Sequence, residues 1–366
     1  MVSHSSEYKI AILISGMSIG GAEKSITSIL PELLTRAEIN LFVFQSLPNQ
    51  IKIPTHAKLR IHYLGARNLG DIKQFNKLRK ILVSYDLIFA HLIWAQIWSG
   101  VMALMDTRLR QHLIWIEHNV YLNRSRIVWY LLSKLGKFTK KIISVSDEVA
   151  SFFSGKTNLN SIVIPNSVII SRKYKKQTRK FNDQLKVVCL GRLVDQKRFD
   201  LALSAFSNFQ SRYNSQRKSS LTIIGGGPLE LDLKLQATGF TGIKFKGFLP
   251  HNKAIDQLAI HDIYLNTSDY EGFCIARIEA LALGLCVVSR KNAGYSQLRT
   301  ILGSDNRMRK IGIFFVEDDF TQISEALYEL NSRKYWSLEK IRQRQIVAES
   351  FSPKNVAKQF FQLLEL

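Results

Sequence analysis

Short apolar runs alternate with helical patterns along this chain. The alternating elements form two successive series, one in each half of the chain. Such runs, bounded by turn residues, are typical of buried strands, and the amphipathic segments between them are typical of helices. In the first half the predicted strands are residues 8–14, 39–44, 86–91, 113–117, 141–146 and 161–164. In the second half they are residues 185–190, 221–224, 243–245, 263–267 and 285–289. The alternation predicts two α/β units, each a parallel sheet with helices wound on both faces.

The domain organisation follows from length and composition. A chain of 366 residues is too long for one ordinary hydrophobic core, which favours two domains. We place the N-terminal Rossmann-like domain at residues 1–170 and the C-terminal one at residues 185–345. Residues 171–184 are polar and strongly basic, as in an interdomain linker. Residues 346–366 end in an amphipathic helix.

The composition is that of a soluble globular protein, with 46% hydrophobic and 22% charged residues. The first residues are polar, so we expect no signal peptide. Residues 92–105 form the most apolar stretch, but they include Gln96 and Ser99 and fall short of the roughly 20 apolar residues that span a bilayer. The three cysteines show neither metal spacing nor a disulfide framework. We therefore expect a cytoplasmic protein.

The net charge indicates an anionic partner. Lys and Arg number 51 against 29 Asp and Glu, a formal charge of +22. Nucleic acid, an anionic membrane surface and phosphorylated substrates all attract such a chain. No nucleic-acid reading motif accompanies the charge, so nucleic acid is not an expected partner. Residues 123–141 interleave basic side chains with Trp129 and Tyr130, which suits either an anionic membrane surface or an ordinary packed helix whose lysines face water.

Residues 263–290 indicate the ligand most directly. They are predicted to form a strand, a polar loop, a helix that begins near Cys274, and a second strand. The first N–H groups of a helix have no partner within it and, with the helix dipole, form an anion site. Glu271 precedes the helix and Glu279 lies about two turns further on. Because carboxylates repel phosphate but accept hydrogen bonds from hydroxyls, the pattern predicts a nucleotide sugar.

The same stretch resembles the signature of glycosyltransferase family 4, which contains retaining enzymes of the GT-B fold. The matching residues run Ser268-x-x-Glu271-Gly272-Phe273, then five residues, then Glu279-Ala280-x-Ala282-x-Gly284-x-x-Val287-Val288. The resemblance implies an α/β fold of two Rossmann-like domains facing a cleft, with the C-terminal helix crossing back to the first domain. It further implies that Glu271 holds hydroxyls of the donor sugar and that Glu279 holds the ribose. The donor phosphates are expected on the backbone of Gly272, Phe273, Cys274 and Ile275.

A second element of the resemblance is Gly191-Arg192 followed by Lys197. Two cations five residues apart on a loop after a strand suit a diphosphate, because Arg binds oxygens bidentately and Lys supplies a compact charge. In the family these two side chains hold the donor's phosphates. The family's other donor contacts correspond here to Gly20, Gly21, Gly226 and Leu249.

Two histidines end predicted strands on the edge where such sheets bind ligands. His118 resembles the family's donor-side histidine, which lies beside the transferred sugar, so we expect it to be catalytic with Glu271, Arg192 and Lys197. A lone strand-end histidine is more often a hydrogen-bonded structural residue, and we interpret His91 in that way.

The resemblance therefore implies a retaining hexosyltransferase. It would move a hexose or N-acetylhexosamine from a nucleotide diphosphate sugar to a hydroxyl of a glycan or lipid-linked acceptor in lipopolysaccharide, capsule or other surface polysaccharide synthesis. No cofactor and no metal are expected, because the chain has no Asp-x-Asp. A non-hydrolysing UDP-sugar epimerase, a non-catalytic protein that binds anionic ligands or nucleic acid, and an inactive scaffold of the same fold remain as alternatives.

Overall fold

The computed structural model describes residues 8–17, 20–45, 51, 53–66, 68–169, 184–213 and 218–364. The chain divides into two compact units, which are residues 1–167 with 353–366 (unit 1) and residues 168–352 (unit 2). The predicted linker at residues 171–184 lies outside the described residues except for Gln184, which begins a strand. Unit 2 extends past the predicted end at residue 345 because α13 (Leu338–Glu349) packs against α9 (Ile275–Ala282).

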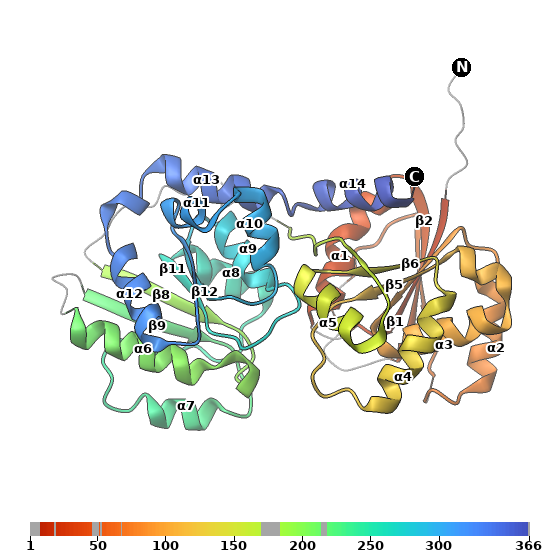
Figure 1. The fold of residues 1–366 in the computed structure, drawn as a ribbon, viewed down its shortest axis with the longest axis horizontal. Helices are drawn as coiled ribbons and strands as arrows, with labels where there is room; N and C mark the ends of the chain where they lie inside the picture. Colours follow the sequence, from red (N-terminus) through yellow and green to blue (C-terminus); the bar gives the residue numbers. More distant parts are fainter. Residues whose placement is uncertain are drawn as a thin grey trace, which may run out of the picture. The chain divides into compact units, whose positions relative to one another are not determined.

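Unit 1 is a parallel sheet with helices on both faces (Figure 1). Its strands are β1 (Tyr8–Gly16), β2 (Ala37–Gln45), β3 (Leu59–Tyr63), β4 (Leu87–His91), β5 (Leu113–Glu117), β6 (Lys141–Ser144) and β7 (Ile162–Val163). Its helices are α1 (Gly21–Leu33), α2 (Ile72–Leu82), α3 (Leu92–Met105), α4 (Arg126–Leu135), α5 (Asp147–Thr157) and, from the far end of the chain, α14 (Pro353–Leu364). Among the described residues the strand order is β3-β2-β1-β4-β5-β6-β7.

Unit 2 repeats the plan. Its strands are β8 (Gln184–Leu190), β9 (Lys218–Ile224), β10 (Ile243–Phe245), β11 (Ile263–Asn266), β12 (Cys286–Arg290) and β13 (Ile313–Val316). Its other helices are α6 (Phe199–Arg212), α7 (Glu230–Gln236), α8 (His251–Ala259), α10 (Tyr295–Leu302), α11 (Asp305–Lys310) and α12 (Phe320–Leu330). The described strands lie in the order β10-β9-β8-β11-β12-β13, and every pairing is parallel.

In both sheets the strand order reverses at one point, between β1 and β4 in unit 1 and between β8 and β11 in unit 2. In doubly wound sheets, ligands bind beyond the carboxyl ends of the strands at this switch point. The predicted fold class, two Rossmann-like parallel-sheet domains, is confirmed. The sequence analysis did not predict β3 and β13, which are edge strands; Leu59–Tyr63 leaves most of its side chains partly exposed and so lacks the apolar run of a buried strand.

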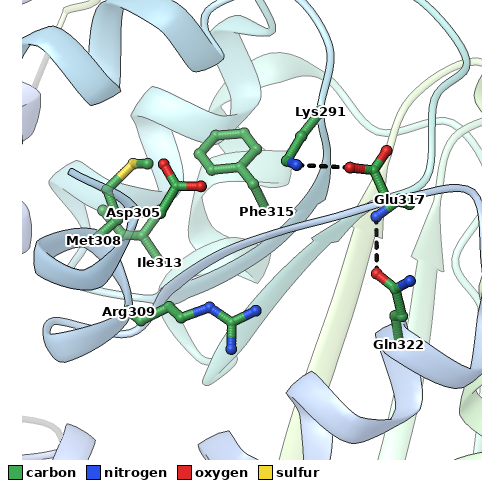
Figure 2. A pocket seen from close by; sticks show the side chains of 8 residues that line it. All are labelled: Lys291, Asp305, Met308, Arg309, Ile313, Phe315, Glu317 and Gln322. Atoms are coloured by element: carbon green, nitrogen blue, oxygen red, sulfur yellow. Dashed lines mark hydrogen bonds and ion pairs between the residues drawn. The ribbon is translucent and has the colours of Figure 1, made fainter.

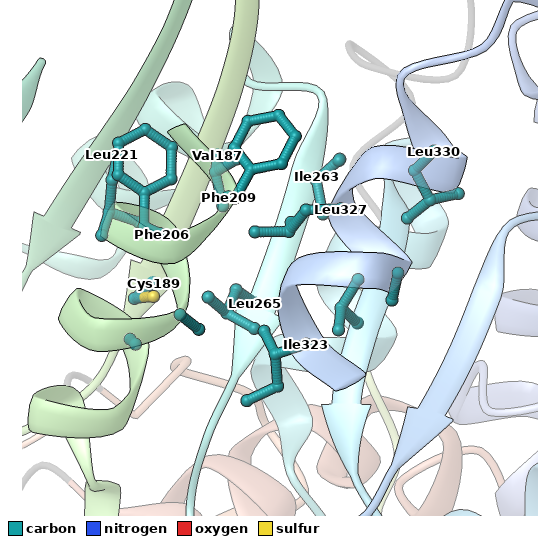
Figure 3. Packing of buried hydrophobic residues seen from close by; sticks show 14 of the residues in the cluster. Val187, Cys189, Phe206, Phe209, Leu221, Ile263, Leu265, Ile323, Leu327 and Leu330 are labelled. Atoms are coloured by element: carbon teal, nitrogen blue, oxygen red, sulfur yellow. The ribbon is translucent and has the colours of Figure 1, made fainter. Parts of the chain in front are cut away.

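Each core lies between the sheet and its helical layers. In unit 1, alternate β1 side chains face opposite layers: Ala11 and Leu13 join the core under α2–α5, while Ile12 faces α1 and α14. In unit 2, α6 and α12 pack over β8, β9 and β11, with Phe206 and Leu327 in contact with the sheet side chains (Figure 3). Cys189 and Cys286, on β8 and β12, are free thiols buried in this core.

The most apolar stretch of the sequence forms α3, whose buried side chains include Trp98 and Met102 in the core of unit 1. Over the described part of the chain, no helix has both the length and the apolar character needed to cross a membrane.

Candidate functional site

In unit 2 the predicted residues follow the two strands of the switch point. The loop that carries Arg192 and Lys197 follows β8, and the loop that carries Glu271 follows β11. These strands are neighbours, with Ile263 paired to Val187. The sheet topology alone therefore brings residues more than seventy positions apart to one edge.

Lys197 and Glu271 form an ion pair at this edge. Nζ of Lys197 lies 2.5 Å from Oε1 of Glu271, and the hydroxyl of Ser268 donates to the same oxygen at 2.8 Å. The two side chains are only 18% and 12% exposed. Burial lowers the pKa of Lys197, but the attraction and hydrogen bond of the Glu271 carboxylate, together with the nearby Cys274, outweigh it, so the pKa is raised and the ammonium stays charged.

Hydrogen bonds connect the two loops along their length. The N–H of Asp269 donates to the carbonyl of Gln196 at 2.9 Å, and the Gln196 amide donates to the carbonyl of Tyr270 at 2.8 Å. The Thr267 hydroxyl donates to the carbonyl of Lys197 at 2.9 Å. Because backbone groups on both loops are used, the ion pair is held by a scaffold rather than by two flexible side chains alone.

The helix after the Glu271 loop begins where the sequence predicts. Cys274 caps α9 with φ of +61°, a left-handed conformation that is uncommon outside glycine. The Asn266 amide donates to its sulfur at 3.0 Å, which holds the strained residue in place. The cap makes no side-chain hydrogen bond to the first amides of α9. These amides, at Ile275 and Ala276, supply the partial positive charge of a helix N-terminus.

Arg277 supports this turn from inside, and the sequence analysis did not single it out. Its side chain is fully buried and donates to the carbonyls of Phe273, at 3.2 Å, and Ala293. It also donates to Ser289 and Asn292, at 3.1 and 3.3 Å. An arginine in the apolar pattern of residues 275–283 was the available signal, because buried charge is rare unless it is hydrogen-bonded.

Glu279 lies on the same helix and is buried, at 6% exposure. Its carboxylate oxygen Oε1 is 3.3 Å from Nε2 of His251, the first residue of α8. His251 is a second residue that the sequence analysis missed, because nothing local to residues 250–252 indicates contact with α9. The pair brings a hydrogen-bonding carboxylate and a half-exposed imidazole to the side of α9.

Arg192 and the glycine loop complete this edge. Arg192 is exposed, and no ion pair is seen for it among the described residues. Gly226 accepts from the N–H of Leu193 at 3.0 Å, and Gly225, at φ of +146°, lies against the carbonyl of Gly191. Glycine is needed at position 225 for this approach between two loops. Leu249, on the following loop, is partly buried and precedes α8.

In unit 1 the predicted glycines follow β1. Gly20 is the N-cap of α1, and a side chain there would meet the Glu23 carboxylate. Gly21 is different, since an added Cβ would have no neighbour within 4 Å. The first turn of α1 therefore presents bare backbone at Gly21, whereas the space beside Gly20 is taken by Glu23.

His118 and His91 lie together in unit 1, at the ends of the neighbouring strands β5 and β4. Nδ1 of His91 is 2.8 Å from Nε2 of His118, and the rings stack at 5.1 Å between centroids. Both are buried, at 5% and 8% exposure. Burial lowers the pKa of His118 to about 4, and burial together with the neighbouring His118 lowers that of His91 well below its usual value. Both imidazoles are therefore neutral at neutral pH.

The basic stretch at residues 123–141 is only partly a basic helical face. Arg124 points inward instead of to solvent, where its guanidinium lies 3.3 Å from Glu117 and over the ring of Tyr121 at 3.8 Å. The structural reason is that Glu117, at the end of β5, is buried and needs a cation. The exposed apolar side chains of α4 are Ile127, Tyr130 and Leu131, at 73%, 61% and 37%.

A separate pocket of about 140 Å³ opens beyond β12 and β13 (Figure 2). Met308, Ile313 and Phe315 line it, and at its rim Lys291 pairs with Glu317 at 2.6 Å. None of the predicted donor residues lines this pocket. Two cations, Lys291 and Arg309, and two carboxylates, Asp305 and Glu317, line this pocket, and it shares no lining residue with the β8–β11 edge.

The arrangement in unit 2 is suited to a phosphorylated polyol. The Lys197–Glu271 pair lies beside the N-terminus of α9, Arg192 is close enough to Lys197 to lower its pKa, and Glu279 lies further along α9. Cations and a helix N-terminus attract phosphate, and carboxylates accept hydrogen bonds from hydroxyls. Among the residues that the structure describes, no three His, Cys, Asp or Glu side chains gather as a metal site.

Two family models match the chain in succession. The model described as Glycosyltransferase Family 4 matches residues 19–172, and that described as Glycosyl transferases group 1 matches residues 170–344. Together the matches extend over most of both units.

Similar proteins agree with the family models. The Campylobacter jejuni enzyme named GalNAc-alpha-(1->4)-GalNAc-alpha-(1->3)-diNAcBac-PP-undecaprenol alpha-1,4-N-acetyl-D-galactosaminyltransferase is 24% identical over 297 residues, covering 77% of this chain and 79% of that protein. A phosphatidylinositol N-acetylglucosaminyltransferase subunit of Arabidopsis thaliana is 24% identical over 207 residues, covering 54% of this chain but only 45% of the plant protein. The chain thus matches less than half the length of that relative.

Among solved structures, Anabaena HepE in complex with UDP and glucose has a TM-score of 0.75 at 18% identity, covering 98% of this chain and 100% of HepE. At this identity the likeness establishes the fold, which is GT-B.

Proposed function

Since the chain belongs to glycosyltransferase family 4 and has the GT-B fold, we propose that it transfers a sugar from a nucleotide diphosphate donor to a hydroxyl group, with retention at the anomeric carbon. The sugar is a hexose or an N-acetylhexosamine, and the acceptor is a glycan or a lipid-linked glycan of the cell surface. HepE, crystallised with UDP and glucose, and the Campylobacter enzyme, named for an undecaprenol-linked substrate, support this choice of donor and acceptor classes.

The observation that carries the proposal is the contact between Lys197 and Glu271 beside the start of α9. A cation, a carboxylate and free helix amides at one sheet edge fit the junction between a diphosphate and a sugar. An ordinary surface ion pair would not need to be buried or to be held by hydrogen bonds between two loops.

In the proposed reaction the bond between the anomeric carbon and the diphosphate oxygen breaks, and the acceptor oxygen forms a bond to that carbon. The acceptor hydroxyl passes its proton to an oxygen of the departing diphosphate, and the nucleoside diphosphate leaves with the electron pair. Arg192, Lys197 and the first amides of α9 would stabilise the charge that builds on the leaving group. Glu271 would accept hydrogen bonds from the sugar hydroxyls and Glu279 from the ribose. His118 would lie beside the transferred sugar.

The proposed location is the inner face of the cytoplasmic membrane, with α4 as the contact surface. Ile127 and Tyr130 are exposed there, and Lys134 lies 5.3 Å over the Tyr130 ring. Exposed apolar side chains next to lysines favour an anionic lipid surface, which is where a lipid-linked acceptor would be found.

A thermal-shift screen against UDP-, GDP-, ADP- and dTDP-sugars tests the donor proposal, because a ligand that binds only the folded state raises its melting temperature. We expect one nucleotide series to stabilise the protein and Lys197→Ala to remove most of that shift. Lys234→Ala is the matched control, since Lys234 pairs with Glu230 at 2.7 Å on α7, away from the switch point. Release of free nucleoside diphosphate that depends on an added acceptor would separate a transferase from an epimerase, which needs no acceptor. If no series stabilises the wild-type protein, the donor proposal is wrong.

A further inference from the structure

We propose that His91 is a positioning residue of the transfer reaction, which holds the imidazole of His118 in one tautomer and one orientation. The inference rests on the proposed function, in which His118 lies beside the transferred sugar. His91 itself needs no contact with the donor, because its effect passes through the hydrogen bond that it shares with His118.

The hydrogen bond between the two rings is well placed to act in this way. The strands β4 and β5 that carry them are adjacent, with His91 paired in register to Ile116, two residues before His118. Nδ1 of His91 and Nε2 of His118 are 2.8 Å apart, and the planes of the rings differ by 24°. Since the backbone of each histidine is fixed by the sheet or lies directly after it, the contact leaves the His118 ring little freedom to rotate.

The surroundings keep both rings neutral. A cavity of about 30 Å³ lies against them, room for about one water molecule, and apolar side chains such as Ile12, Ile29 and Phe360 form most of its wall. Charging an imidazole there is unfavourable, which agrees with the lowered pKa of each. A neutral imidazole carries one N–H and one lone pair.

The tautomers of the two rings depend on each other, because they share one proton in their hydrogen bond. A 2.8 Å contact between two neutral rings contains one proton, on Nδ1 of His91 or on Nε2 of His118. In the first case the single N–H of His118 must be at its Nδ1, and in the second case Nδ1 keeps a lone pair. The partner ring therefore decides whether Nδ1 of His118 is a donor or an acceptor.

Nδ1 of His118 is the atom that remains for a ligand. It is buried and has no hydrogen-bond partner in the described structure. Buried polar atoms are usually satisfied, so an orphan of this kind at a sheet switch edge indicates a group that a ligand completes. A hydroxyl of the transferred sugar fits, because it can donate or accept.

The test uses two substitutions at His91 of similar size, one with a hydrogen-bonding side chain and one without. In His91→Asn the side-chain amide occupies nearly the position of Nδ1 and can keep the bond, whereas His91→Leu removes it at similar size. We expect His91→Leu to lower kcat by about 10- to 100-fold, the cost of a misplaced catalytic group, with the donor KM nearly unchanged. His91→Asn should recover most of that loss. His62→Leu is the control, since His62 is bonded to Asn40 at 2.7 Å in the same sheet but away from the switch point, and it should leave kcat unchanged.

Nitrogen NMR of the His118 ring supplies a readout that does not need turnover. We expect a single neutral tautomer in the wild-type protein at neutral pH, the same tautomer in His91→Asn, and a mixture in His91→Leu. A tautomer mixture in the wild-type protein would overturn the proposal even if His91→Leu fails to fold. So would equal losses of kcat in the Asn and Leu variants, which indicate a merely structural role.

The failure of this inference can be told apart from failure of the proposed function. The kinetic probes are UDP-glucose, UDP-galactose and UDP-N-acetylglucosamine, with GDP-mannose as a second base. If the wild-type protein turns over one of these nucleotide sugars and His91→Leu has the same kcat, the positioning role is wrong while the transferase function stands. If the wild-type protein turns over no nucleotide sugar, the proposed function is wrong, and the positioning role falls with it.

Discussion

Lys197 and Glu271 are 74 residues apart in the chain, yet their side chains meet at 2.5 Å between the loops that follow β8 and β11. The contact balances a cation against an anion at the edge where the phosphates are proposed to bind. A diphosphate is itself an anion, so it would compete with Glu271 for the Lys197 ammonium. Donor binding is then expected to rearrange an existing pair rather than fill an uncompensated positive site.

The competition predicts opposite effects of Glu271→Gln on binding and on turnover. Removing the carboxylate charge leaves Lys197 free for phosphate, so the affinity for UDP should rise about fivefold, or ~1 kcal/mol, the upper value for a partly exposed ion pair. Turnover should fall, because the amide no longer accepts from the sugar hydroxyls in the same way. Titration calorimetry measures the first effect, with Glu329→Gln on α12 as the control, since Glu329 pairs with Lys334 at 3.4 Å. Weaker UDP binding by Glu271→Gln would contradict the competition.

The second prediction concerns the support of the α9 turn. Gly294 has φ of +87°, and a Cβ there would lie 2.9 Å from the carbonyl of Phe273 and against Arg277. Gly303 has φ of +82°, but its added Cβ would meet only the movable end of Arg307. Both alanine variants suffer left-handed strain of roughly 1–2 kcal/mol, and Gly294→Ala should lose about 1–3 kcal/mol more through crowding. Chemical denaturation of the whole protein measures the free energy of unfolding of both variants. Equal losses would mean that the backbone near Gly294 moves away from Phe273 and Arg277 at little cost.

A buried ion pair in unit 1 gives the third prediction. Arg124→Met leaves Glu117 buried without its cation, so we expect a loss of about 3–5 kcal/mol in the free energy of unfolding. Arg126→Met, at the exposed start of α4, should change stability by less than about 0.5 kcal/mol. Adding Glu117→Gln to Arg124→Met should restore part of the loss, because no unpaired charge then remains. Equal stability of the two single variants would place Arg124 in solvent.

The fourth prediction is a pH dependence of stability from His118. The unfolded side chain has its ordinary pKa of 6.5, and the folded one has a pKa of about 4. Between these values the unfolded state binds more protons than the folded state. The stability that His118 contributes is therefore fully present above pH 6.5 and is lost as the pH decreases toward 4. The loss from this residue should total about 3 kcal/mol. Burial raises the pKa of Glu117, which opposes the trend.

The comparison of wild type with His118→Gln isolates the histidine, because Glu117 and His91 are present in both proteins. Gln can keep the bond to His91 but does not titrate in this range. The variant should therefore lose less stability than wild type between pH 6.5 and 4, by urea denaturation at each pH. Parallel losses in the two proteins would show that His118 is not held neutral by the fold.

Membrane contact through α4 is the fifth prediction. Ile127→Glu should weaken binding to vesicles of phosphatidylglycerol and phosphatidylcholine about tenfold, since one buried aliphatic side chain is worth about 1.5–3 kcal/mol. Ile346→Glu on α13 is the control, because Ile346 is also exposed, at 55%, but belongs to unit 2. Sedimentation with vesicles measures both. If the two variants bind alike, α4 is not the contact surface.

Much of the architecture could be predicted from the sequence because apolar runs and sheet topology are local or follow general rules. The strand–loop–helix–strand pattern at residues 263–290 already indicated where α9 begins and that a helix N-terminus would face the same edge as Arg192 and Lys197. The pairing of Lys197 with Glu271 required the strand order, since β8 and β11 are neighbours only after the sheet has formed.

The missed residues are those whose partners lie on distant elements. The contacts of Arg277, His251 and Arg124 depend on which side chains are buried opposite them. The periodicity of the sequence does not predict those partners. Sequence reasoning treated His91 as a separate structural histidine, whereas the register of β4 and β5 brings it within hydrogen-bond distance of His118. Buried charge and strand-end histidines were the available signals, but their partners could not be named without the fold.

The most direct test of the proposed donor site is the steady-state turnover of Lys197→Ala and Glu271→Ala with the nucleotide sugar that stabilises the wild-type protein. Both side chains would contact groups whose charge or geometry changes in the transition state, so each variant should be slower by at least about 100-fold. Lys234→Ala should keep the wild-type rate. Near-wild-type turnover in both site variants, with the donor still bound, would contradict the account.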